Sequence, residues 1–111
     1  MDTRLPAHLE VSAILRSVEA AGGFATVLHR GERDAGTILL LTMYRGEGVT
    51  LFERMPQLDG SRQFIAAKRE NPENPQEMSE YLEKRARQDS DIWVLELDIA
   101  DAERFVASLP R

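Results

Sequence analysis

The placement of its glycines constrains this chain more than any other feature. All seven lie at the ends of apolar runs: Gly22, Gly23, Gly31, Gly36, Gly46, Gly48 and Gly60. The five after residue 23 divide residues 24–69 into four short segments. Glycine reaches positive φ without a Cβ clash, so glycines confined to the ends of runs are typical of turns. The pattern predicts a glycine-turned antiparallel meander that carries a few helices.

The four segments read as strands over 24–30, 37–45, 49–55 and 62–69. Their connections are short, which predicts that successive strands are antiparallel neighbours, with 31–36 as a polar hairpin loop. Apolar residues occupy both faces of 37–45, so this strand is expected near the centre of the sheet.

Helices are predicted on either side of the meander. In residues 6–21, Val11, Ile14, Leu15 and Val18 form one apolar stripe, and Gly22 follows as the stop. Residues 75–89 follow an expected N-cap at Asn74, with Pro75 at the first position and Glu77 bonding back to the cap. A fifth strand is expected over 92–97. A short helix over 99–109, capped by Asp98, would close the chain.

The predicted fold class is therefore α+β: a five-stranded, mainly antiparallel sheet with three helices in the order αββββαβα. Four strands form the meander and the fifth is C-terminal. If the helix over 75–89 crosses the sheet, strand 92–97 can pair in parallel with an existing strand; otherwise it pairs antiparallel.

Length and composition predict one domain over residues 1–111. The chain is 42% apolar and 30% charged, has no cysteine, and lacks an apolar run near the roughly 20 residues that span a bilayer. Its first residues lack the pattern of a signal peptide, so we expect a cytoplasmic protein that does not bind membranes. The net charge of −5 argues against nucleic acid as a partner.

The sequence lacks the residue patterns of the common metal-binding, nucleophilic and phosphate-binding sites. His8 and His29 have no ligand spacing and no cysteine to complete a metal site, so we expect no metal and no cofactor. No serine lies in a nucleophile elbow, and Gly31 and Gly36 lack the ending of a phosphate-binding loop. We predict no catalytic residue.

One arginine set carries a binding hypothesis. Arg30 and Arg54 end the first and third strands of the meander, at the same edge of the sheet, and Arg33 lies in the adjacent loop. With His29 they are predicted to hold a small anion such as phosphate or carboxylate. The alternative is that these are solvated strand ends paired with nearby carboxylates: Glu32, Asp34, Glu47 and Glu53.

Two aromatic side chains allow two interpretations each. Trp93 alternates with Leu95 and Leu97, which favours a core or interface position over an exposed stacking platform. Tyr81 and Met78 form a thin apolar stripe, which either packs on the sheet or docks a partner; packing is the favoured interpretation.

Several runs resemble one known family: Val11-Ser12-Ala13-Ile14-Leu15-Arg16, Gly23-Phe24-Ala25-Thr26-Val27-Leu28, Ala35-Gly36-Thr37-Ile38-Leu39-Leu40, and Asp91-Ile92-Trp93-Val94-Leu95-Glu96 leading into Phe105. The chain is similar over nearly its whole length to small alphaproteobacterial proteins grouped as domain of unknown function 1491. The resemblance implies a bacterial, cytosolic protein and transfers no catalytic or binding residue.

Two functions are therefore predicted. The preferred one is a non-enzymatic binding or protein-interaction module whose partner is another protein or a second copy in a homodimer. The alternative is a binding protein or enzyme for a small anion that uses Arg30, Arg33, Arg54 and His29. A concave site with convergent polar groups favours the second, and a flat apolar surface favours the first.

Overall fold

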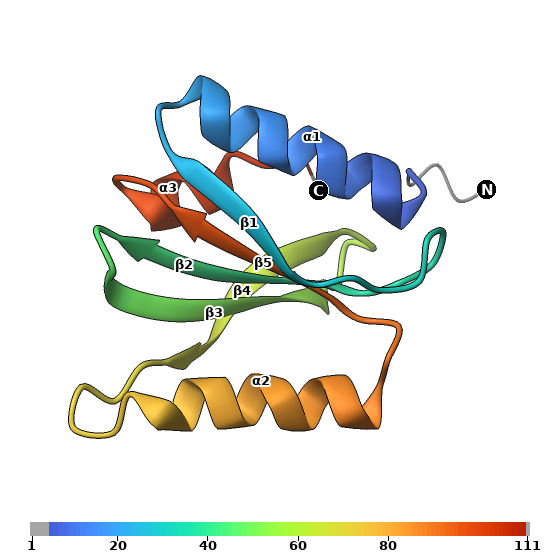
Figure 1. Cartoon of the computed structure of the whole chain (residues 1–111). Helices are drawn as coiled ribbons and strands as arrows, with labels where there is room; N and C mark the ends of the chain where they lie inside the picture. Colours follow the sequence, from blue (N-terminus) through green and yellow to red (C-terminus); the bar gives the residue numbers. More distant parts are fainter. Residues whose placement is uncertain (1–4, 111) are drawn as a thin grey trace.

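A single mixed sheet organises the chain, with helices on both of its faces (Figure 1). The structure is a computed structural model that describes residues 5–110. In chain order the elements are α1 (Ala7–Ala20), β1 (Phe24–His29), β2 (Ile38–Tyr44), β3 (Glu47–Pro56), β4 (Arg62–Arg69), α2 (Gln76–Gln88), β5 (Trp93–Asp98) and α3 (Ala102–Ala107). The predicted α+β class and the order αββββαβα are confirmed.

The strands lie in the order β1-β5-β2-β3-β4. The strand β5 pairs antiparallel with β1 and parallel with β2, so each of the two pairing modes left open for residues 92–97 occurs on one side of it. The pairs β2–β3 and β3–β4 are antiparallel, as predicted. The predicted pairing of the first strand with the second is wrong, because β5 separates them.

Burial explains why β5 takes the central place. Its side chains alternate between two cores, with Trp93 and Leu95 on one side and Val94 on the other. A strand that is apolar on both faces loses water from both only inside a sheet. Phe24 of β1 is 77% exposed, and a strand with one wet face suits an edge.

Each face of the sheet has its own core. The core under α1 and α3 contains Ala7, Val11, Ile14, Val18, Ile38, Leu40, Phe52, Trp93, Leu95, Leu97, Ile99, Val106 and Leu109. The core under α2 contains Leu39, Leu41, Leu51, Met78, Ile92 and Val94. The core position of Trp93 is confirmed, since the residue is 3% exposed, and Met78 and Tyr81 pack on the sheet as favoured.

The connection between β1 and β2 is not the predicted hairpin loop. It crosses the chain just before β5, where the Glu32 N–H donates to the Asp91 carbonyl over 2.9 Å. A Cβ on Gly31 or on Gly36 would overlap the same Asp91 carbonyl oxygen. These two glycines are therefore required by close backbone approach and not by positive φ.

The hairpin between β2 and β3 turns earlier than predicted. Tyr44 pairs with Glu47, and the two residues between them, Arg45 and Gly46, have φ of 53° and 78°. Positive φ at both central residues is the geometry whose twist matches a two-residue hairpin. The third strand accordingly begins at Glu47 and not at residue 49.

Two predicted helix caps are wrong. Pro75 and not Asn74 occupies the N-cap position of α2, so no side chain caps the helix, and the Glu77 carboxylate binds Lys68 Nζ over 2.7 Å. Asp98 belongs to β5, and its Oδ1 accepts a hydrogen bond from the Arg45 N–H over 2.8 Å. As a result α3 starts only at Ala102, after Asp101 in the left-handed conformation.

The helix α2 is held to the sheet by a polar cluster as well as by its core. Arg85 Nη1 donates to the Glu53 carboxylate over 2.7 Å and to the Tyr81 hydroxyl over 3.1 Å. The hydrogen bond that Arg85 donates to Glu53 raises the pKa of Arg85 above its ordinary value. The cluster ties the last two turns of α2 to β3.

Candidate functional site

The residues of the predicted anion site lie at the end of the sheet where the C-terminal ends of β1 and β3 both lie. The shared end is as expected, because β1 opposes β5, β5 runs with β2, and β2 opposes β3. Two strands nevertheless stand between them, which separates Arg30 from Arg54 by roughly 14 Å at the usual strand spacing. Instead of clustering, the four residues have separate partners.

At the end of β1, His29 and Arg30 contact the start of β5 and the residue just before it. His29 Nδ1 donates to the Ile92 carbonyl over 2.7 Å, and the Arg30 guanidinium lies 5.5 Å from the centre of the Trp93 ring. Arg30 remains exposed, so its donors face solvent.

On the β3 side, Arg54 is engaged by α1. Its two terminal nitrogens donate to the two carboxylate oxygens of Glu10, and its guanidinium lies 4.3 Å from the Phe64 ring centre. The Arg54 side chain is only 11% exposed. This ion pair links α1 to the sheet, and an anion would have to replace Glu10 to reach Arg54.

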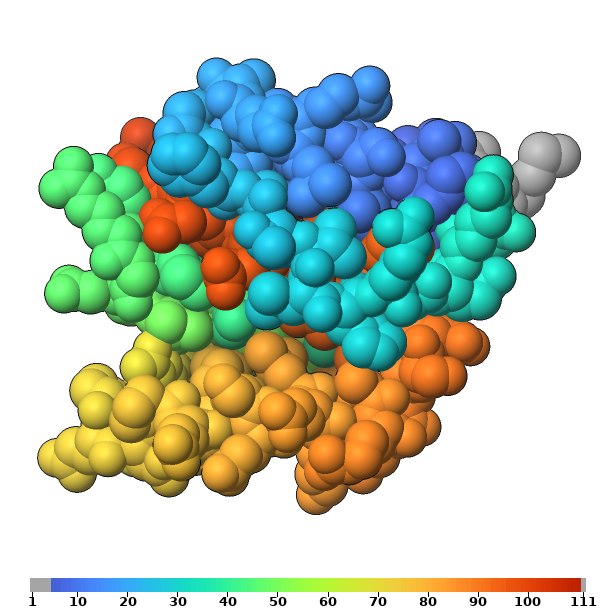
Figure 2. All heavy atoms as spheres, in the orientation of Figure 1, coloured from blue at the N-terminus to red at the C-terminus, as the bar shows by residue number. Residues whose placement is uncertain are grey.

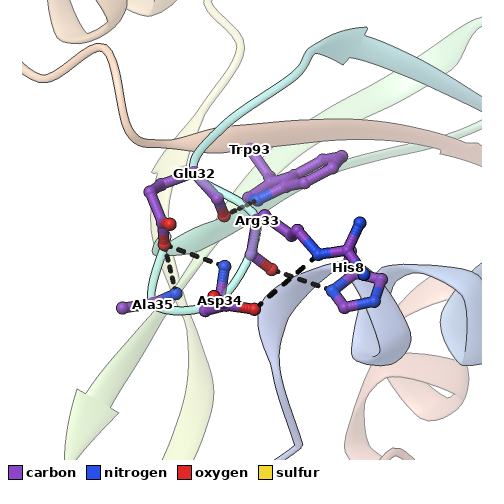
Figure 3. Close-up of polar contacts among 6 residues, drawn as sticks. All are labelled: His8, Glu32, Arg33, Asp34, Ala35 and Trp93. Atoms are coloured by element: carbon purple, nitrogen blue, oxygen red, sulfur yellow. Dashed lines mark hydrogen bonds and ion pairs between the residues drawn. The ribbon is translucent and has the colours of Figure 1, made fainter.

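Arg33 lies on the 31–36 connection, where short polar contacts fix the backbone (Figure 3). The Glu32 carboxylate accepts the N–H groups of Asp34 and Ala35, and the Glu32 carbonyl accepts the Trp93 indole N–H over 2.8 Å. The Arg33 side chain is 75% exposed, with Nε 4.0 Å from the Asp34 carboxylate.

The same connection closes the start of α1. The Ala7 and His8 N–H groups donate to the Asp34 and Arg33 carbonyls over 2.9 and 2.8 Å. The imidazole Nδ1 of His8 also donates to the Arg33 carbonyl over 3.1 Å (Figure 3). Helix N–H groups that would attract an anion are thus already satisfied by the protein.

The free edge of β1 is the most distinctive open feature of the molecule. Exposure alternates along the strand, with Phe24 77% and Leu28 49% exposed and Ala25 and Val27 packed on the α1 core. Phe24 and Thr26 share the α2 face of the sheet, yet α2 packs on β2 and β3 and leaves them bare. Figure 2 shows β1 uncovered on the near side, between α1 and α2.

The alternation of hydrogen bonds along β5 shows which backbone N–H and C=O groups of β1 have no partner among the described strands. The N–H groups of Trp93 and Ile99 donate to carbonyls just before and within β2, so odd residues of β5 point to β2 and even ones to β1. Glu96 therefore exchanges hydrogen bonds with Thr26 opposite it. The N–H and C=O groups of Ala25 and Val27 point the other way, and within residues 5–110 no strand pairs with them.

The opposite edge of the sheet differs in charge. The strand β4 carries Arg62, Lys68 and Arg69, whereas Phe24 to Leu28 contain no charged residue and no proline. Charged residues on an edge discourage strand addition. Of the two edge strands, only β1 lacks the acidic, lysine and arginine side chains that discourage the addition of another strand.

An open groove of about 510 Å³ lies at the other end of the sheet, between the β2–β3 hairpin and α3. It is lined by Thr42, Met43, Tyr44, Glu47, Gly48, Thr50, Arg69, Asp101, Ala102, Glu103 and Arg104. Arg69 is neutralised there by Glu103 over 2.9 Å.

The two threonine hydroxyl groups in the groove already donate hydrogen bonds within the protein. Thr42 donates to the Thr50 carbonyl over 3.4 Å, and Thr50 donates to the Gly48 carbonyl over 3.3 Å. The lining residues include no histidine, cysteine or serine. A Ser–His or Cys–His pair, one arrangement that activates a nucleophile, is therefore not present among these lining residues.

Within residues 5–110, no cluster of three or more histidine, cysteine or acidic side chains is placed to hold a metal ion. In the same part of the chain, no helix is both long enough and apolar enough to cross a membrane.

The architecture and the open edge define a class: a small α+β domain with helices on both faces of a mixed five-stranded sheet. A family model described as "Protein of unknown function (DUF1491)" matches residues 5–107. The chain belongs to the DUF1491 family, as its sequence runs predicted. No curated protein matches it.

Solved structures of the family share the fold. A crystal structure of a DUF1491 family protein from Caulobacter crescentus CB15 is 33% identical, with a TM-score of 0.81 over 96% of this chain and 98% of that one. An NMR structure of a DUF1491 family protein from the same organism, also 33% identical, gives 0.78 over 98% and 97%. The solution structure of protein Atu0922 from A. tumefaciens is 30% identical and gives 0.76 over 98% of both chains.

Proposed function

We propose that the protein is a non-enzymatic, cytoplasmic protein-interaction module that docks an extended segment of a partner along β1. One observation carries the proposal: an uncharged sheet edge whose Ala25 and Val27 backbone groups are open and whose Phe24 side chain is exposed. Strand addition uses such an edge, with main-chain hydrogen bonds for affinity and alternate side chains for specificity.

The commitments of the polar residues also support a binding role. Arg54 is paired with Glu10, Arg69 with Glu103, and Arg85 with Glu53. Chemistry at an active site needs polar groups that converge on a substrate. Here the strongest polar groups join elements of the fold to one another.

In-cell photocrosslinking tests the proposal. A photoreactive phenylalanine derivative replaces Thr26 on β1 or, as the matched control, Ile65, an exposed apolar position on the α2 face of β4. In an alphaproteobacterial host we expect protein adducts from position 26 and none from position 65. Equal adduct yields at the two positions, or none at either, would contradict docking at β1.

Proline scanning provides the second control. Ala25→Pro removes an N–H that faces away from β5, so it should suppress the adducts without removing a hydrogen bond inside the sheet. Adducts that persist in Ala25→Pro would place the partner elsewhere.

A further inference from the structure

The β1 edge is complementary to itself, and this identifies its partner. We propose that the segment docked on β1 is β1 of a second copy, paired antiparallel about a twofold axis at Thr26. This inference rests on the proposed function and specifies it: two five-stranded sheets would join into one continuous sheet of ten strands.

The backbone groups meet correctly in this arrangement. With Thr26 opposite Thr26 of the partner subunit, Ala25 lies opposite Val27 of the partner subunit, and the reverse pair follows by symmetry. Ala25 and Val27 are the two residues whose N–H and C=O groups point outward. The pairs therefore exchange four hydrogen bonds, and Thr26 forms the non-hydrogen-bonded pair between them.

The side chains are also compatible. Phe24 comes beside Leu28 of the partner subunit, the residue at the register shift of β1, which brings together the two most exposed apolar residues of the strand. Aromatic and aliphatic cross-strand neighbours stabilise a sheet. The residues from Phe24 to Leu28 carry no charge, so self-pairing places no like charges opposite each other.

One irregularity lies outside the bonded pairs. The register between β1 and β5 shifts between Val27 and His29, at the end of the strand. Phe24 to Val27 keep a regular ladder with β5, which holds Ala25 and Val27 in the conformation that a second strand needs.

The other edge does not offer the same match. Antiparallel self-pairing of β4 about its centre would place Arg62 opposite Arg69 of the partner subunit, and the reverse pair would repeat the repulsion. Like charges directly opposite each other destabilise strand pairs. Self-association through β1 is thus favoured over self-association through β4.

Cysteine substitution tests the axis directly, because the chain contains no cysteine. A non-hydrogen-bonded antiparallel pair has Cα atoms about 4.5 Å apart, within the range that a disulfide spans. Purified Thr26→Cys should therefore form a covalent dimer under mild oxidation, in a yield that falls less steeply on dilution than random collision predicts. Ile65→Cys, the matched exposed position on β4, should remain monomeric.

Sedimentation velocity over a concentration series tests the backbone pairing in the unmodified chain. We expect reversible dimers in the wild type, and Ala25→Pro should weaken association at least about tenfold, or about 1.4 kcal/mol. Circular dichroism confirms that the variant is folded. The Thr26 side chain is exposed, so Thr26→Lys should leave the fold intact. It should weaken association as well, because it places two like charges at the axis.

Three outcomes would overturn the inference. These are a wild type that stays monomeric throughout the series, equal oxidation of Thr26→Cys and Ile65→Cys, or a dimer that neither Ala25→Pro nor Thr26→Lys weakens. The in-cell adducts from position 26 are read separately. A monomeric protein that still crosslinks to another protein there rejects self-pairing and retains the interaction module.

Discussion

Glycine serves this fold in two ways, and the two differ in what a methyl group would do. Gly46 has φ of 78° and open space around its Cα, so a side chain there meets only the conformational penalty of the left-handed region. Gly31 has ordinary φ but lies against the Asp91 carbonyl, so a Cβ has no room. The first role could be predicted from turn position, whereas the second depends on a chain segment sixty residues away.

This difference predicts unequal costs for the same substitution. Gly31→Ala should destabilise the protein by about 3 kcal/mol, because rigid backbone and not a movable side chain must give way. Gly46→Ala should cost about 1 kcal/mol. Urea unfolding of both variants measures the difference, and equal costs would mean that the 31–36 connection does not cross close to Asp91.

The four residues of the predicted anion site remain a testable hypothesis. If Arg30, Arg33, Arg54 and His29 bind a small anion, phosphate should raise the melting temperature saturably at constant ionic strength. Ligand at 100 times Kd would add about 2.7 kcal/mol. The Arg30→Gln/Arg33→Gln double variant should lose this response.

The choice of variant follows from the contacts of the arginines. Arg30 and Arg33 are exposed, whereas a substitution of Arg54 would leave Glu10 without its partner and disturb the α1 contact. Identical responses to phosphate and chloride in the parent protein would exclude the site.

At the scale of elements, hydrophobic patterning predicts which strands exist better than it predicts which strands meet. The run from Ile92 to Leu97 is apolar on both faces, a pattern that indicates a central strand, and Phe24 and Leu28 are apolar but stay wet. Short connections favoured neighbours in sequence, and this preference gave the wrong partner for β1. Burial on both faces of β5 outweighs the shorter connection.

The open edge was not predicted as a binding surface, although strand 24–30 is an edge strand in the predicted meander as well as in the structure. The uncharged stretch from Phe24 to Leu28, in contrast to the charged β4, was the available signal.

The attachment of α2 gives a prediction about one ion pair. Arg85→Met should destabilise the protein by about 1–3 kcal/mol, because it leaves the largely buried Glu53 carboxylate with only the long hydrogen bond from the Tyr81 hydroxyl, over 3.4 Å. Lys84→Met, at the exposed neighbouring position, is the matched control and should change stability by less than about 0.5 kcal/mol. Chemical denaturation measures both variants.

The pH dependence of this contribution has a definite sign. Glu53 raises the pKa of Arg85 in the folded protein, so folding favours the charged guanidinium. Stability from the raised pKa is present below the unfolded-state pKa and is lost only as pH rises through the folded value. The destabilisation from Arg85→Met should therefore be constant between about pH 6 and pH 9, and a marked change within that range would contradict a contribution from the charged form.

At the scale of the whole molecule, the central strand of the sheet comes from near the end of the chain. The strands β1 and β2 are made early in the sequence but do not pair with each other, and the strand that joins them comes from residues 93–98. The same C-terminal segment supplies Trp93, Leu95 and Leu97 to one core and Ile92 and Val94 to the other. The strand β1 is therefore hydrogen-bonded to the rest of the sheet only through β5 among the described strands.

This topology predicts the effect of removing the C-terminal segment. A chain that ends at residue 90 should lose cooperative unfolding, because β1 has no remaining partner strand and both cores lose their central residues. A four-strand meander would instead keep β1 paired with β2 and retain a folded sheet. Thermal melts followed by circular dichroism distinguish the two arrangements.

Complementation makes the test specific to β5. A synthetic peptide of residues 91–111, added to the truncated chain, should restore a cooperative transition by filling the gap between β1 and β2. The same peptide with Leu95→Asp should fail, because Leu95 is fully buried and a carboxylate there would lack a partner. Cooperative unfolding of the truncated chain without peptide, or equal rescue by both peptides, would contradict a central β5.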